Sequence, residues 1–90
     1  MGEGWLVDSD DCWIWRFHRD QKGWIKDPKV FIDRGRRMQE GPPLLTERRH
    51  LRKAEADQLW LSLQTQGWRQ LATPAWGDAV KLESISEDQP

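Results

Sequence analysis

The sequence contains no tyrosine and a single cysteine, Cys12, among its 90 residues. One thiol excludes a disulfide within the chain and leaves no cysteine pair for a zinc or redox site, so we expect a reducing, cytoplasmic setting. No run of about 18 apolar residues occurs, so we expect no membrane-spanning helix. The first residues carry neither a basic start nor an apolar stretch of about 7–15 residues, and we therefore expect no secretory signal peptide.

Sequence motifs for several kinds of chemistry are also missing. The glycine-rich nucleotide loops G-x-x-x-x-G-K-[ST] and G-x-G-x-x-G do not occur. His18 and His50 are far apart and have no neighbouring Cys or second His, so they do not form a zinc-ligand pattern. Asp8, Asp10 and Asp11 are closely spaced but lack the glycine and glutamate of an EF-hand loop. We expect no metal, no cofactor and no enzymatic activity.

Tryptophan dominates the aromatic content, with seven Trp against two Phe. A Trp side chain buries about 150–250 Å², so a few of them supply a large part of a small core. Apolar residues make up 37% and charged residues 32%, a balance compatible with folding. We expect one small domain over residues 1–77 and a flexible acidic tail over residues 78–90, where apolar side chains become sparse.

A strand is predicted over residues 12–18, because the segment is rich in aromatic and β-branched side chains. One face takes Trp13, Trp15 and Phe17. The opposite face takes Cys12, Ile14, Arg16 and His18. Cys12 is expected to be a small buried side chain on this strand.

Further strands are predicted over residues 4–8 and 24–26, and residues 29–33 either continue the latter strand past a bulge or form a fourth strand. Turn-forming residues at 8–11 and 20–23 join these segments as hairpins.

Residues 34–45 are predicted to be a loop, because Gly35 and the Gly41-Pro42-Pro43 run disfavour regular structure. Residues 46–51 fit either an edge strand or an extension of the helix that follows.

The clearest helix is predicted over residues 53–66, where the apolar side chains recur with helical spacing. These residues are Ala56, Leu59, Trp60 and Leu63. Gly67 is placed to cap the C-terminus of the helix. The predicted fold class is therefore α+β, a three- or four-stranded antiparallel sheet packed on one main helix. In this fold the face with Trp13, Trp15 and Phe17 meets Trp60 and Leu63.

The charge distribution is uneven although the net charge is −1. Residues 1–15 hold four acidic residues and no Lys or Arg, residues 16–53 hold twelve basic and five acidic residues, and residues 54–90 hold two basic and six acidic residues. Basic residues gather in two runs within the middle segment, and these form a candidate site for nucleic acid or another polyanion. The candidate residues are Arg34, Arg36, Arg37, Arg48, Arg49, Arg52 and Lys53.

Protein association is the favoured function, with an unknown partner or by self-association through a sheet edge or a Trp-centred patch. Trp5, Trp24 and Trp76 are the candidate interface residues, because Trp is a frequent anchor of protein interfaces. Trp76, bracketed by Pro74 and Gly77, is also expected to tuck against the body of the domain. Binding of nucleic acid or another polyanion through residues 34–53 is the alternative, and membrane association is not expected.

Several Trp and Gly positions also carry a family resemblance. They are Gly4-Trp5-Leu6, Trp13-x-Trp15-x-Phe17, Glu55-Ala56-x-x-x-Trp60-x-x-Leu63-x-x-x-Gly67-Trp68 and Pro74-x-Trp76-Gly77. Over roughly residues 4–77 the chain resembles a family of small, Trp-rich, uncharacterised proteins from marine cyanobacteria. The resemblance implies a cytosolic bacterial protein and, because that family has no assigned activity, it transfers no functional residue.

Overall fold

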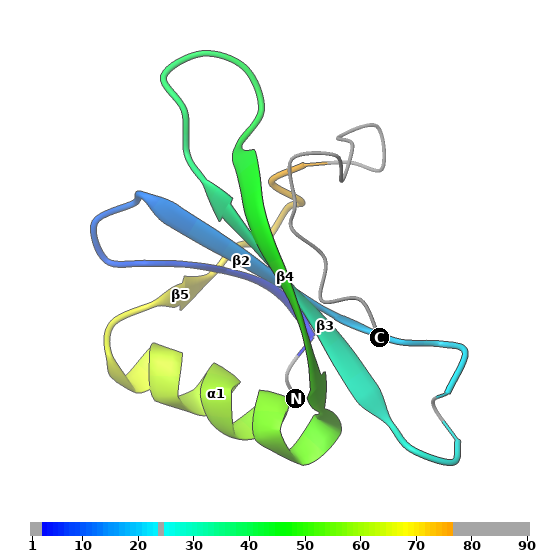
Figure 1. Cartoon of the computed structure of the whole chain (residues 1–90). Helices are drawn as coiled ribbons and strands as arrows, with labels where there is room; N and C mark the ends of the chain where they lie inside the picture. Colours follow the sequence, from blue (N-terminus) through cyan, green and yellow to red (C-terminus); the bar gives the residue numbers. More distant parts are fainter. Residues whose placement is uncertain (1–2, 24, 77–90) are drawn as a thin grey trace.

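A computed structural model of the chain describes residues 3–23 and 25–76. They form, in order, β1 (Gly4–Val7), β2 (Trp13–Arg19), β3 (Lys29–Arg36), β4 (Leu44–Arg52), α1 (Lys53–Thr65) and β5 (Arg69–Gln70) (Figure 1). The five strands make one antiparallel sheet in the order β4-β3-β2-β1-β5, and α1 packs against it. The predicted α+β fold is confirmed, with five strands rather than three or four. The predicted boundary at residue 77 and the tail lie outside the described residues.

The strands next to the two long hairpin loops differ from the prediction. β3 continues to Arg36 and β4 begins at Leu44, so the connecting loop is 37–43 rather than 34–45. The ambiguous segment 46–51 is strand. Ile25 and Lys26, predicted as strand, lie in a turn closed by the Asp27 N–H donating to the Gly23 carbonyl, and Ile25 is 96% exposed.

The main core lies between α1 and one face of the sheet. Its buried side chains are Leu6, Phe17, Val30 and Ile32 from the sheet and Ala56, Trp60 and Leu63 from α1. Phe17 and Trp60 meet edge to face, with ring centroids 5.1 Å apart. This contact confirms the predicted pairing of Phe17 with the helix. Trp15 is half-buried and packs against the same core, as predicted, whereas Trp13 is half-buried and lies outside this cluster.

The end of α1 follows from Gly67, which has φ +104°. The Gly67 N–H donates to the Gln64 carbonyl at 3.1 Å and the Trp68 N–H donates to the Leu63 carbonyl at 3.0 Å. These bonds form a Schellman motif, and glycine adopts its positive φ without the steric cost of a Cβ. The predicted cap is confirmed, and the turn brings Trp68 against Trp15, with ring centroids 4.9 Å apart.

A second, smaller core lies on the other face of the sheet. Val7, Ile14, Leu45 and Trp76 are buried there together. Gly35 makes this packing possible, since a Cβ at this position would lie 2.8 Å from the Trp76 ring. Trp76 is 7% exposed, so it tucks against the body as predicted, and its prediction as a surface residue is wrong. Among the described residues, no helix has the length and apolar character needed to cross a membrane.

Candidate interaction surfaces

Paired residues of neighbouring strands lie on the same face of the sheet, so the registers arrange side chains in rows. On the helix side, the row Trp13–Arg36–Leu44 is nearest to the β3–β4 loop. The next row is Trp15–Arg34–Glu47. The core side chains of α1 meet Phe17 and Ile32, which belong to the following row, and the outermost row therefore stays accessible.

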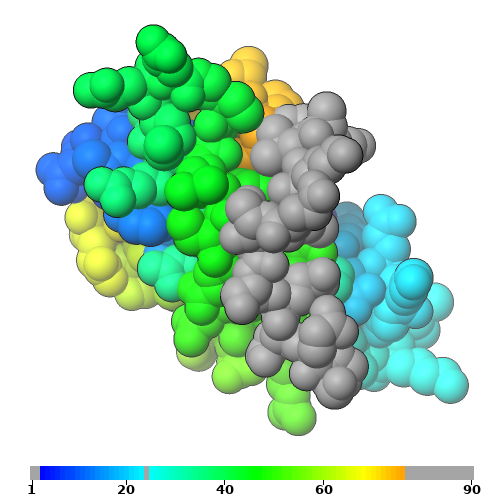
Figure 2. All heavy atoms as spheres, turned by 45° about the horizontal axis from the view of Figure 1, so that its top comes forward, coloured from blue at the N-terminus to red at the C-terminus, as the bar shows by residue number. Residues whose placement is uncertain are grey.

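We define the hairpin patch as Trp13, Arg36, Met38 and Leu44. Met38 is 47% and Leu44 is 45% exposed, Arg36 is exposed and Trp13 is half-buried. A shallow hollow of about 600 Å³ lies at the patch and is lined by Arg36, Met38 and Leu44 together with the loop. Figure 2 shows this hairpin as a green projection at the upper left of the molecule.

The side chains behind the hairpin patch are held in place. The Arg34 guanidinium lies over the Trp15 ring, 4.6 Å from its centroid, and 5.6 Å from that of Trp13. Arg34 also forms an ion pair with Glu47 across the strands. Stacking of a guanidinium on an indole restricts the motion of both side chains, so Arg34 supports the Trp13 ring from behind.

A second hollow, of about 370 Å³, lies between the β3–β4 loop and the segment before Trp76. Its apolar lining includes Met38, Pro42, Pro43, Leu71 and Pro74. Arg37 and Met38 line both hollows, so the two hollows adjoin at the β3–β4 loop.

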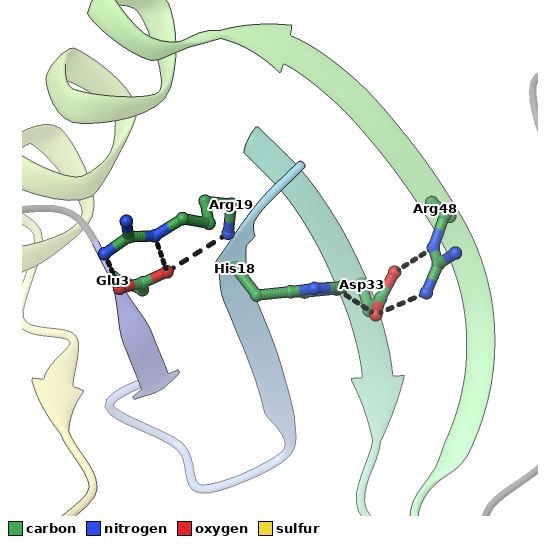
Figure 3. Close-up of polar contacts among 5 residues, drawn as sticks. All are labelled: Glu3, His18, Arg19, Asp33 and Arg48. Carbon is green, nitrogen blue, oxygen red and sulfur yellow. Dashed lines mark hydrogen bonds and ion pairs between the residues drawn. The ribbon is translucent and has the colours of Figure 1, made fainter. Parts of the chain in front are cut away.

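A polar network lies on the face opposite α1 (Figure 3). Asp33, which is 1% exposed, accepts hydrogen bonds from His18 Nε2 at 2.9 Å, Arg48 Nε at 2.6 Å and Arg48 Nη2 at 3.1 Å. Burial opposes ionisation of the carboxyl, but the bonds from His18 and Arg48 outweigh it, so the pKa of Asp33 lies below its ordinary value. The network therefore ties β2, β3 and β4 together through one buried charge.

An aromatic row lies beside this network. His18, Phe31 and His50 are neighbours across β2, β3 and β4. The His50 ring stacks on Phe31 at 4.4 Å, and the Arg48 guanidinium lies 4.8 Å from the Phe31 centroid. The Phe31 ring is thus engaged by protein groups, which makes it a poor platform for stacking a nucleic-acid base.

Figure 3 also shows the pair between Glu3 and Arg19, which joins the start of β1 to the end of β2. The hydrogen bond from the Arg19 side chain lowers the pKa of Glu3 from its ordinary value. Both side chains are about half exposed, so this pair differs from Asp33 chiefly in its access to solvent.

The predicted anion-binding residues do not all share one surface. Five of them form ion pairs with acidic residues of the described ranges: Arg34 and Arg49 with Glu47, Arg37 with Asp11, Arg48 with Asp33, and Lys53 with Asp57. Strand alternation places Arg34, Arg36 and Arg49 on the helix side and Arg48 and Arg52 on the opposite side. Binding of a polyanion stays a prediction, for which Arg36 and Arg52 are exposed.

The remaining predicted residues differ in accessibility. Trp5 is half-buried, with its ring 4.5 Å from that of Trp76 and the Arg16 guanidinium 5.0 Å from its centroid. Trp24 lies outside the described residues. Cys12 precedes β2 and is exposed, so its predicted burial on a strand is wrong. The Asp8 carboxylate accepts the Cys12 N–H at 2.7 Å, which holds Cys12 in the turn.

Sequence reasoning missed Trp13, Met38 and Leu44 as surface residues. The alternation of side chains along β2 correctly assigns Trp13 to the same face as Phe17. It does not predict how much of that face the helix covers. A helix of 13 residues is about 20 Å long, and one such helix covers part of the face.

The fold and these surfaces define a small α+β domain that presents an apolar and basic hairpin at one end of its sheet. The chain belongs to DUF1651, a family of proteins of unknown function, whose model matches residues 3–75. Neither a curated protein nor a solved structure matches the chain. The resemblance to a family without an assigned activity is thus confirmed, while a marine cyanobacterial source stays a prediction.

Proposed function

We propose that this domain is a protein-interaction module, without catalytic activity, that binds its partner through the hairpin patch. The observation that carries the proposal is the row Trp13–Arg36–Leu44, which continues into the exposed Met38 of the β3–β4 loop. Trp, Met and Arg are enriched at protein interfaces, where a few such anchors supply most of the binding energy.

The chemistry of the patch indicates what a partner would present. Met38 and Leu44 offer apolar surface beside the hollow, so the partner needs an apolar side chain. Arg36 is exposed and no ion pair joins it to an acidic residue of the described ranges, so a partner carboxylate is its natural counterion. The proposed partner is therefore a segment that combines apolar and acidic side chains.

Peptide selection tests this proposal. Random peptides of about twelve residues, displayed on phage, would be selected on the immobilised domain and then measured in solution by calorimetry. We expect peptides with an apolar residue next to Asp or Glu, and we expect Leu44→Asp to weaken them by about tenfold or more, as for an interface anchor.

The matched control is Leu61→Asp, which makes the same change on the exposed side of α1, where Leu61 is 61% exposed. Its affinity should equal that of the unchanged protein. Peptides that bind the Leu44→Asp and unchanged proteins equally would contradict the proposal. Binding of a labelled duplex or single strand at about 50 mM salt, falling steeply with added salt, would instead support the polyanion alternative.

A further inference from the structure

Backbone groups line the outer edge of β4, which is the last strand of the sheet in the described part of the chain. β4 is nine residues long and stands at the end of the strand order, and within residues 3–23 and 25–76 no strand pairs with its outer side. The Lys53 N–H donates to the Pro28 carbonyl at 2.9 Å, so these two residues are a hydrogen-bonded pair. Such pairs recur at every second residue, so Leu51 and Arg49 bond to β3, while His50 and Arg52 direct their backbone groups outward.

The hydrogen bonds between β3 and β2 lead to the same assignment of outward-facing residues in β4. The Asp20 N–H donates to the Lys29 carbonyl, and the Arg37 N–H donates to the Cys12 carbonyl. Odd-numbered residues of β3 therefore bond to β2, and the even-numbered ones bond to β4. Since Val30 pairs with Leu51 and Ile32 with Arg49, His50 between them faces outward with its N–H and carbonyl.

We propose that an extended, acidic segment of a partner protein adds to β4 as a sixth strand. This inference deepens the proposed function and rests on it for the existence of a protein partner. β4 holds three arginines and one glutamate, and Arg49 and Arg52 are exposed. A second copy would bring the same excess of arginine over glutamate to the shared edge, whereas acidic side chains on the added strand would complement it.

The outer edge of β4 leads directly into the hairpin patch. Leu44 is both the first residue of β4 and a member of the patch, so a segment that pairs along β4 reaches the patch at one end. Acidic residues of the segment would lie beside Arg52 on the face opposite α1, and apolar residues would lie on the helix side, beside Leu44. Backbone bonds supply affinity in this mode of recognition, and the alternate side chains supply selectivity.

A pair of substitutions at His50 isolates the backbone contact. His50→Ala and His50→Pro remove the same imidazole, including its hydrogen bond to Asp20, but only the proline removes the outward N–H. Proline is tolerated on an edge strand when its nitrogen faces solvent, and unchanged amide spectra of the other strands would verify the fold. The probe is a synthetic peptide of four Val-Glu repeats with blocked ends, titrated while β4 amide signals are followed by NMR. We expect His50→Ala to bind like the unchanged protein and His50→Pro to bind about tenfold more weakly or not at all.

Two further probes test the mode of binding in the unchanged protein, independently of any variant. A Val-Glu peptide N-methylated on the edge that would face β4 should not bind, and a Val-Lys repeat should not bind. Equal binding of the Val-Lys repeat, equal binding by His50→Pro, or no shift of β4 amides at about 5 mM Val-Glu peptide would overturn the inference. A concentration-dependent dimer that His50→Pro abolishes would also overturn it, because the occupant would then be a second copy. Phage-selected peptides that bind through Leu44, while the Val-Glu probe fails, would leave the proposed function standing without the added strand.

Discussion

Replacement of Asp33 by Asn removes a negative charge that the His18 and Arg48 side chains contact inside the sheet. The carboxylate accepts three hydrogen bonds from His18 and Arg48 and is 1% exposed. Asn keeps the shape and one acceptor oxygen but removes the charge that faces the Arg48 guanidinium, itself 16% exposed. Loss of one partner of a buried ion pair costs about 3–5 kcal/mol, and the partial exposure of Arg48 favours the lower end.

This cost is large for a domain whose free energy of unfolding is of the order of 5–15 kcal/mol. At about 4–8 °C per kcal/mol for a chain of this size, the melting temperature of Asp33→Asn should fall by about 12 °C or more. Glu3→Gln is the matched control, since Glu3 also pairs with an arginine but is half exposed. Its effect should stay below about 1 kcal/mol, as for other surface pairs. Urea unfolding monitored by Trp fluorescence measures the free energy of unfolding of both variants.

The same carboxylate predicts a pH dependence. The pKa of Asp33 is lower in the folded protein than the value of about 3.9 for an unfolded chain. Its contribution to stability is therefore present above the unfolded pKa and is lost as the pH falls through the folded pKa. The difference in unfolding free energy between the unchanged protein and Asp33→Asn should shrink below about pH 4. An effect of Asp33→Asn as small as that of Glu3→Gln, or a difference that does not shrink in acid, would refute the reasoning.

Three further predictions concern packing and exposure. Trp60→Ala should cost about 3–5 kcal/mol in urea unfolding, because Trp60 is 4% exposed and packs on Phe17, and a loss below about 1 kcal/mol would contradict this core. Gly35→Ala should cost about 1–3 kcal/mol and shift the indole NMR signal of Trp76, which the new methyl group would displace; an unmoved signal would contradict the packing. The exposed Cys12 thiol should react with a disulfide reagent in the native protein as fast as in urea, and protection in the native state would contradict its exposure.

The parts of the fold that depend on local chemistry could be predicted from the sequence. The helix follows from the spacing of Ala56, Trp60 and Leu63, and its end follows from Gly67, whose positive φ is a backbone property. The face of β2 follows from alternation, which assigns Phe17 to the core. Each of these signals lies within a few residues of the feature that it predicts.

The parts that depend on contacts between distant residues could not be predicted. From composition, Gly35 predicts the end of a strand. It lies inside β3 instead, where the absence of a Cβ leaves room for the Trp76 ring. Asp33 has no distinguishing neighbours in the sequence, and its network arises because the strand registers bring His18 and Arg48 to it. The accessibility of Leu44 likewise depends on where one helix stops covering the sheet.

The junction between β4 and α1 has a mechanical consequence. Arg52 ends the strand and Lys53 begins the helix, with no residue between them. The Lys53 N–H donates to the carbonyl of Pro28, directly before β3, so the first residue of α1 is bonded to the chain that enters the sheet. A ligand that stiffens β4 would therefore also stiffen the first turn of α1. Its footprint in amide hydrogen exchange would extend into the helix, beyond any residue that the ligand touches.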